Sequence, residues 1–424
     1  MRIKLGRIFS VLIIIFLGLG RIEASDLTLP VDQVKAGMKG KGKTVFAENK
    51  IEEFDVEILG ILHNVEPKKS IIIAKLNSNV LDKSGVIQGM SGSPVYLGGK
   101  LVGAVAYNFG SFAKEAIVGI TPIEEMLAIS GKELAKSSFS SRLPITKSLS
   151  LDELFELDKE FFLAKSSFIS EGQTISPIVV PLIFNGFSSL VFERARPFFS
   201  NLGFSPVRGG PSGQSLEKIS VPDLSLQGGD PVAVQLVEGD LSVAAVGTVT
   251  YVDGNRVLAF GHPAYNLGAV DYAMAKAKVI TVVSSLATSF KLAYPDFIVG
   301  RFSQDRASGL LGEIGKFPQL IPVNIKIMDE GGAAKDFKIK IVKDQILTPL
   351  LVNLSLMNVF SAEERAIGDL SLELNGNIYL DYEGLSVHLE DFFSGNLDTS
   401  VTNISNLLTA VVYLLTNNEF RDLG

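Results

Sequence analysis

The sequence predicts a mainly β fold with a few helices, and three observations carry that prediction. The chain holds 40 glycines and no tryptophan in 424 residues, which fits many short strands joined by tight turns. Residues 28–130 are a succession of short apolar or alternating stretches separated by glycine, as in a small barrel. A second region of this kind begins near Asp230. With 46% hydrophobic and 20% charged residues, the chain can bury a large core.

A chain of 424 residues predicts two or three domains rather than one. Between the two β regions the composition shifts toward serine and lysine, and the apolar spacing around Leu151–Phe162 predicts a surface helix. A further amphipathic helix is expected over Ser188–Leu202, interrupted by Pro197. The expected segments are an export signal (1–25), a first β half (26–130), a linker and helical segment (131–229), a second β half (230–395) and a C-terminal helix (396–424).

The N-terminus has the pattern of an export signal. Arg2, Lys4 and Arg7 precede an apolar run from Ile8 to Gly20, and a small residue, Ala24, ends a cleavage-site pattern. The run is short for a membrane span, and no later stretch reaches about 18 apolar residues. We therefore expect an exported bacterial protein, periplasmic or secreted, without an integral span in the mature chain. An uncleaved N-terminal anchor is the alternative.

Composition also narrows the chemistry. The chain has no cysteine, so it can form neither a disulfide nor a thiolate site. Its three histidines are scattered and do not predict a zinc site, and we find no phosphate-binding or dinucleotide fingerprint. A formal net charge of −7 does not favour nucleic acid as a partner. We expect no cofactor and no metal.

The most informative stretch is Gly85-Val-Ile-Gln-Gly-Met-Ser-Gly-Ser-Pro-Val-Tyr96. A glycine at position 89 permits a turn that aims the N–H groups of Gly89 and Ser91 at one point, where they can hold an oxyanion while the Ser91 hydroxyl attacks a carbonyl. A β-hairpin follows, with Gly98-Gly99 as its two-residue loop. A plain glycine-rich turn between strands is the alternative interpretation.

A second candidate lies at the end of another predicted hairpin. Residues 247–252 and 256–260 alternate around Asp253-Gly254-Asn255, and Gly261-His262-Pro263 follows. A histidine between glycine and proline is held on a stiff turn and can project into a cleft. A turn histidine without a role is the alternative.

Three helix signals stand outside these stretches. Thr121 and Glu124 form a capping box with Pro122 at the first helical position, and Ser361 and Glu364 form another. Apolar residues recur at helical spacing between Thr399 and Leu415.

Two of these blocks resemble one family. The serine stretch, with the strand after it, resembles the serine loop of the SpoIVB-type sporulation peptidases, and residues 247–263 resemble the histidine loop of that family. Gln304-Asp305-Arg306 resembles a weaker third block. The resemblance implies a chymotrypsin-like double β-barrel in a permuted order, because here the serine block precedes the histidine block. It further implies a serine endopeptidase with Ser91 as nucleophile, His262 as general base and the amides of Gly89 and Ser91 as oxyanion hole.

The acid of the implied triad is less defined. The aspartate of the family precedes the serine loop, where this chain has Asn77, and an asparagine can also orient an imidazole. Asp82 is another candidate. We expect Asp271 to act as the acid, because Gly268-Ala-Val-Asp271 could return the chain beside the His262 ring.

The sequence therefore predicts an exported serine endopeptidase with a protein or peptide substrate. The alternative is a catalytically silent protein of the same fold that binds a peptide or an envelope protein.

Overall fold

The computed structural model describes residues 27–110, 115–131, 168–170, 173–209, 223–329, 331–363, 369–381 and 384–418. Strands predominate over helices in these residues, and the mainly β prediction is confirmed. The predicted export signal lies outside the described residues, as do residues 132–167 of the predicted linker, including the helix expected around Leu151–Phe162.

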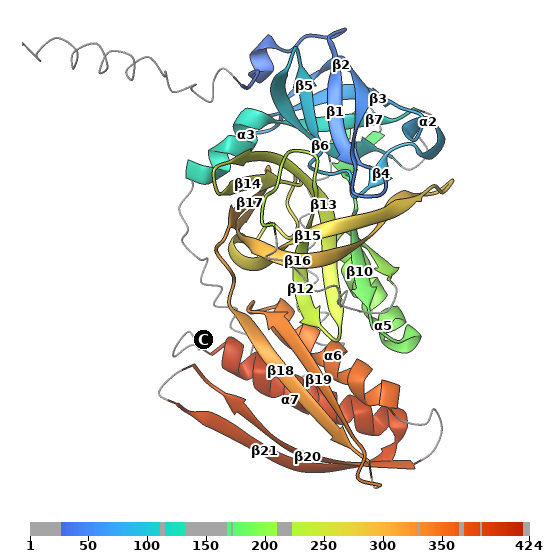
Figure 1. The fold of residues 1–424 in the computed structure, drawn as a ribbon, viewed down its shortest axis with the longest axis vertical. Helices are drawn as coiled ribbons and strands as arrows, with labels where there is room; N and C mark the ends of the chain where they lie inside the picture. The colour runs from blue at the N-terminus through green and yellow to red at the C-terminus, as the bar shows by residue number, and fades with distance from the viewer. Residues whose placement is uncertain are drawn as a thin grey trace, which may run out of the picture.

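The N-terminal part of the chain forms a closed antiparallel barrel, at the top of Figure 1. The ring closes because the fifth and sixth strands of the chain pair with each other as well as with their other neighbours. The six strands, in ring order, are β5 (Pro94–Leu97), β1 (Lys39–Val45), β2 (Ile51–Glu66), β3 (Lys69–Asn77), β7 (Ile117–Pro122) and β6 (Lys100–Phe109).

Short elements accompany this barrel. The hairpin of β8 (Phe168–Ser170) and β9 (Gln173–Pro177) extends its sheet from β6. The others are η2 (Val31–Gln33), α2 (Leu81–Ser84), β4 (Ile87–Gln88), α3 (Ile123–Leu127) and η3 (Ala128–Gly131).

A second closed ring lies below the first in Figure 1. Its strands are also antiparallel, and the pairing of β12 with β13 closes it. The predicted double β-barrel is thus confirmed, with the serine half first along the chain. In ring order the six strands are β13 (Ser242–Asp253), β14 (Arg256–Ala259), β17 (Gly309–Ile314), β16 (Ser289–Arg306), β15 (Gly268–Val283) and β12 (Pro231–Gly239).

The sheet of the second barrel continues in both directions. On one side β10 (Val180–Asn185) pairs with β13, and β11 (Phe204–Arg208) pairs with β10, with α5 (Ser189–Asn201) between them in the chain. On the other side β19 pairs with β12 and leads into a C-terminal unit of hairpins over two helices (Figure 1). That unit comprises β18 (Leu320–Met328), β19 (Ala334–Val342), α6 (Leu347–Glu363), β20 (Asp369–Tyr379), β21 (Ser386–Asn396) and α7 (Leu397–Thr416).

Each barrel has its own apolar core. Alternate residues of β2, namely Phe54, Val56 and Ile58, are buried inside the first barrel, as a strand with one inward face requires. Tyr272 and Phe302 are among the buried side chains of the second core. Two closed barrels cannot share the strands of their rings, so the contact between them is made by turns, side chains and the short strand β4, which pairs with β16, and the candidate site lies in that contact.

Several local predictions need correction. The helix α3 begins at Ile123 rather than at Pro122, because Thr121 is still in β7. The Thr121 hydroxyl donates to the Gly261 carbonyl and does not cap the helix. The capping box at Ser361 does not start a helix, since Ser361 lies in the last turn of α6. The helix α5 continues through Pro197, where buried Phe198 and Phe199 hold it in the core.

Candidate active site

The serine turn, residues Gly89–Ser93, connects β4 to β5. Gly89 and Gly92 have φ angles of 91° and 95°, in the left-handed region that glycine tolerates. The turn is tied to the first barrel by the Gly92 N–H, which donates to the Val105 carbonyl at 2.8 Å, and it is braced internally by the Ser93 hydroxyl, which donates to the Met90 carbonyl at 2.6 Å. Ser91 lies at the centre of this turn and is fully buried.

Strand β13 of the second barrel holds the other side of the serine turn. The Thr248 N–H donates to the Ser91 carbonyl at 2.8 Å, and the Thr248 hydroxyl donates to the Gly89 carbonyl at 3.0 Å. The Thr250 hydroxyl donates to the Gly92 carbonyl at 2.8 Å. Both threonines are fully buried. Three hydrogen bonds therefore fix the serine turn against the opposite barrel.

The histidine turn, Phe260–Asn266, follows β14 and is tied to the first barrel in return. Phe260 and Gly261 have φ angles of 69° and 71°, which reverse the chain sharply before His262. The Thr121 hydroxyl donates to the Gly261 carbonyl at 2.6 Å across the interface. A Cβ on Gly261 would lie only 3.0 Å from that of Ala104, so the backbone of this turn packs directly on β6.

The two turns meet backbone to backbone. A Cβ added to Gly92 would lie 1.9 Å from the Thr248 carbonyl oxygen and 2.5 Å from the Phe260 nitrogen, so only glycine fits there. Ser91 and His262 are the neighbours of Gly92 and Gly261 along the chain. The structure thus brings the predicted nucleophile and the predicted base to one interface, each on its own barrel.

The imidazole of His262 is oriented by its own turn. Its Nδ1 lies 2.8 Å from the Pro263 carbonyl oxygen. A carbonyl can only accept, so Nδ1 must carry the hydrogen and the neutral ring presents Nε2 as an acceptor. Both Nε2 of His262 and Oγ of Ser91 are buried and lack a hydrogen-bond partner among the described residues. The two atoms are therefore not hydrogen-bonded to each other in this structure.

Burial decides the protonation of His262. Loss of solvation lowers the pKa of its imidazole to about 4, although backbone groups of Pro263 and Ile178 act in the opposite direction. The ring is therefore neutral at neutral pH, which is the form a general base needs.

Asp305 fixes the histidine turn by accepting hydrogen bonds from three of its N–H groups. Its carboxylate is fully buried and accepts from the N–H groups of Ala264 at 2.9 Å, Tyr265 at 2.6 Å and Asn266 at 2.8 Å. Burial raises the pKa of Asp305 to about 6, while these N–H bonds oppose the rise, so the carboxylate is ionised at pH 7. The Pro263–Ala264 peptide unit consequently donates to Asp305 through its N–H and accepts from His262 through its carbonyl.

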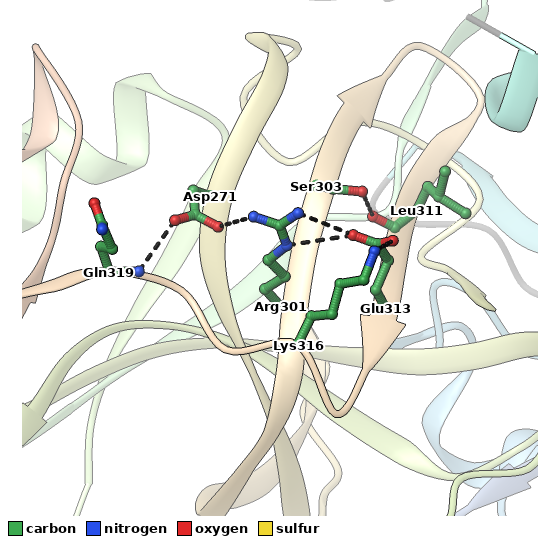
Figure 2. Close-up of polar contacts among 7 residues, drawn as sticks. All are labelled: Asp271, Arg301, Ser303, Leu311, Glu313, Lys316 and Gln319. Atoms are coloured by element: carbon green, nitrogen blue, oxygen red, sulfur yellow. Dashed lines mark hydrogen bonds and ion pairs between the residues drawn. The ribbon is translucent and has the colours of Figure 1, made fainter. Parts of the chain in front are cut away.

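The predicted acids have other surroundings. Figure 2 shows Asp271 on β15, where its carboxylate accepts from Arg301 Nη1 at 3.1 Å and from the Gln319 N–H at 3.1 Å. Arg301 also pairs with Glu313 at 3.1 Å (Figure 2). Asp82 lies in the exposed first turn of α2, and Asn77 is exposed at the end of β3. The assignment of Asp271 as the acid stays a prediction, and its ion pair with Arg301 does not support it.

The predicted oxyanion hole is built on the serine turn. In the part of the chain that the structure describes, neither the Gly89 N–H nor the Ser91 N–H donates to a turn or loop carbonyl. Gly89 is kept in place by its carbonyl, which Thr248 binds, and by β4, which pairs in parallel with the start of β16.

A buried lysine supports this turn. The aliphatic stem of Lys291, on β16, packs where a Cβ of Gly89 would lie, 3.3 Å from its Cδ. Its Nζ donates to the Thr44 hydroxyl at 2.7 Å and to the Thr248 hydroxyl at 3.5 Å. The side chain is fully buried, and this burial lowers its pKa to about 7.

Sequence reasoning missed part of this assembly. Asp305 stood in the third block of the resemblance, and Thr248 stood in the histidine block, but neither had a stated role. Lys291 gave no signal, because a lysine on a strand is usually solvated. Among the described residues, no group of histidine and carboxylate side chains could hold a metal ion, and no helix has the length and hydropathy of a membrane span.

Comparison with known proteins identifies a family that part of the chain matches. Residues 24–127 match the family model described as SpoIVB peptidase S55, which covers the first barrel and the serine turn. The predicted resemblance to the SpoIVB-type serine peptidase domain family is confirmed over this part of the chain. No curated protein and no solved structure gave a significant match.

The contact between the two turns predicts a strong effect of Gly92→Ala. The added methyl group would overlap the Thr248 carbonyl, and φ at this position is unfavourable for alanine. We expect the free energy of unfolding to fall by more than about 3 kcal/mol. Gly60→Ala is the control, because nothing lies within 4 Å of its Cβ position, and it should change stability by less than about 1 kcal/mol. Denaturant unfolding measures both changes. If Gly92→Ala and Gly60→Ala lowered the free energy of unfolding equally, the close contact between the two turns at Gly92 would be contradicted.

The carboxylate clamp predicts that Asp305→Asn loosens the histidine turn. An amide cannot accept from three N–H groups as a carboxylate does, so stability should drop by about 2 kcal/mol and amide exchange at residues 264–266 should accelerate. Asp329→Asn is the control, since that aspartate is exposed and, among the described residues, its side chain accepts from the Ala333 N–H. Unchanged exchange at 264–266 in Asp305→Asn would contradict the clamp.

The burial of Lys291 predicts a pH dependence of stability. Between the folded-state pKa of about 7 and the ordinary value of 10.5, the unfolded chain binds a proton that the folded chain does not. The free energy of unfolding should therefore rise with pH, by about 3 kcal/mol from pH 7 to 9.5 relative to Lys291→Met. Denaturant unfolding of both proteins across this range measures it, and parallel pH profiles would contradict the assignment.

Proposed function

From the match of residues 24–127 to a serine peptidase family, we propose that the protein is an exported serine endopeptidase that cleaves a protein or peptide substrate. The observation that carries the proposal is the pair of orphaned atoms at the barrel interface. Within the described residues, Ser91 Oγ and His262 Nε2 are both buried without a hydrogen-bond partner, on two turns in backbone contact. An unsatisfied buried polar atom costs about 1–3 kcal/mol, and two such atoms of the residue types needed for a nucleophile and a base, on contacting turns, support a shared catalytic role.

In the proposed reaction, His262 Nε2 takes the proton of Ser91 Oγ as that oxygen attacks the scissile carbonyl. The resulting oxyanion accepts from the N–H groups of Gly89 and Ser91. The imidazolium then gives its proton to the leaving amine, and an acyl group remains on Ser91. Water, deprotonated by His262, attacks this ester, and Ser91 regains its proton as the acid product leaves.

We assign the orienting role of the triad acid to Asp305, acting through one peptide unit. The Pro263 carbonyl accepts the Nδ1 hydrogen of His262, while the N–H of the same peptide unit donates to Asp305. A hydrogen bond to a carboxylate polarises the peptide and makes its carbonyl oxygen a stronger acceptor. The negative charge of Asp305 therefore stabilises the imidazolium without touching the ring.

The proposed nucleophile is tested by labelling with a fluorophosphonate, which reacts with activated serines. We expect labelling of the folded protein and a loss of about a thousandfold or more in rate in Ser91→Ala and His262→Ala. Ser130→Ala and His63→Ala are matched controls at surface positions and should keep the wild-type rate.

Labelling that survives Ser91→Ala would contradict the proposal. If labelling is absent both in the folded wild type and in a variant whose site has been opened, as described below, the catalytically silent peptide-binding protein is the better account.

A further inference from the structure

One edge of β6 carries the serine turn and, directly beside it, a different segment of the chain. Along this edge β6 first pairs with β5. Val105 then makes two hydrogen bonds with the serine turn: its N–H donates to the Ser93 carbonyl at 2.9 Å, and its carbonyl accepts from the Gly92 N–H at 2.8 Å. The next residue, Ala106, accepts from the Ile178 N–H at 2.8 Å. From Tyr107 to Phe109, β6 pairs with β9.

A change of register makes this arrangement possible. Successive residues of a strand normally turn their hydrogen-bonding groups to opposite edges. The pairing of β6 with β7 on the other edge shifts register between Val105 and Tyr107. Val105 and Ala106 can therefore face the same edge, where one holds the serine turn and the other holds Ile178. A bulge beside an active site commonly re-aims a strand in this way.

The segment Ile175–Ile178 has the features of a bound peptide. It is extended and antiparallel to β6. Pro177, which has no N–H to donate, lies opposite Tyr107. Hydrogen-bonded and non-hydrogen-bonded pairs alternate between antiparallel strands, and this pair is a non-hydrogen-bonded one because the pair before it, Ala106 and Ile178, is bonded. The side chain of Ile178 is 1% exposed and packs in the apolar cluster that includes Met90 and Val105. Beyond Ile178 the chain passes to β10 on the second barrel, and the backbone of Ile178 lies close enough to act on His262.

We propose that the edge of β6 from Ala106 to Phe109 is the peptide-binding edge of the site, and that residues 175–178 occupy it as an intramolecular, substrate-like strand. This inference rests on the proposed function. An external substrate would add to the same edge as an extended strand, a recognised mode of peptide binding, with an apolar side chain in the place of Ile178. The reacting carbonyl would then follow that side chain, next to Ser91.

The arrangement explains why the site is closed. Ser91 is fully buried and His262 is 2% exposed, so no substrate backbone can reach them while the edge is filled. In this proposal the segment leaves β6 when the site opens, while the serine and histidine turns keep their hydrogen bonds to Thr248, Thr250 and Thr121. The same segment therefore indicates substrate preference and controls access.

A disulfide lock tests the inference directly. Asn108 and Ser176 are paired across the two strands, with Oγ of Ser176 3.0 Å from Oδ1 of Asn108, and the chain has no cysteine to interfere. In Asn108→Cys/Ser176→Cys, made in a Ser91→Ala background, the probe is a fluorescent peptide of residues 173–180. We expect the reduced protein to bind it and the oxidised protein to bind at least tenfold more weakly.

Lys326→Cys/Asp336→Cys, across the remote pair of β18 and β19, is the matched control, and its oxidation should change nothing. A peptide with aspartate at the position of Ile178 should bind at least tenfold more weakly than the native peptide. Equal binding by oxidised and reduced forms of the lock would overturn the inference.

An opening variant gives the opposite change. Ile178→Asp places a charge in the apolar cluster and should release the segment, raising peptide affinity at least tenfold in the Ser91→Ala background, whereas Ile178→Val should not. If Ile178→Asp does not fold, the comparison of peptide binding by the oxidised and reduced forms of Asn108→Cys/Ser176→Cys tests the inference alone. If neither the folded opening variant nor the reduced lock binds peptide, the inference is wrong.

The two proposals can fail separately. With Ser91 present, fluorophosphonate labelling should fall on oxidation of the lock and rise in Ile178→Asp. Peptide binding as expected, with no labelling of any form, would reject the endopeptidase and keep the peptide-binding edge. Equal labelling of Ser91 in oxidised and reduced protein would keep the endopeptidase and reject the edge.

Discussion

The candidate site depends on threonine hydroxyls that cross the interface between two closed barrels. Each barrel closes its own ring of strands, so neither needs the other to complete that ring. Thr248 and Thr250 bind carbonyls of the serine turn, while Thr121 binds the carbonyl of Gly261. These bonds go in both directions, from each barrel to the turn of the other. A barrel alone would leave its turn without the partner that sets its position.

The two buried charged residues of this interface, Asp305 and Lys291, each reach the site through an intermediate group. Asp305 reaches His262 by way of a peptide unit, and Lys291 reaches the serine turn by way of Thr248 and the backbone of Gly89. Both side chains are buried, and burial raises the pKa of Asp305 and lowers the pKa of Lys291. Each side chain lies where a small movement of a turn changes its hydrogen bonds. The cost of burying them is understandable if they fix geometry that the reaction needs, since buried charges stabilise folds poorly.

Local sequence signals predicted much of the fold and part of the site. The Gly98-Gly99 hairpin forms as expected, with φ of 57° and 80°, and the turns with Gly89 and Gly261 adopt the positive φ that their glycines allow.

Contacts that depend on tertiary structure could not be predicted. Thr121 reads as a helix cap by its local pattern, but its hydroxyl binds Gly261 instead. The helix α6 is buried on all sides from Leu347 to Phe360, so its apolar residues are not confined to one face and it lacks the one-sided periodicity that identifies a helix. Asp305 and Asp271 are indistinguishable by sequence type, and only the fold places one of them under the histidine turn.

The central claim is that Ser91 and His262 form one catalytic site across the barrel interface. The most direct measurement is a crystal structure of the protein after reaction with a fluorophosphonate. Our account predicts phosphorus bonded to Ser91 Oγ, a phosphoryl oxygen bound by the N–H groups of Gly89 and Ser91, and His262 Nε2 within about 3.2 Å of an adduct oxygen. It also predicts that residues 175–178 have left β6. An adduct on Ser91 with His262 turned away from it, or no adduct on Ser91, would contradict the account.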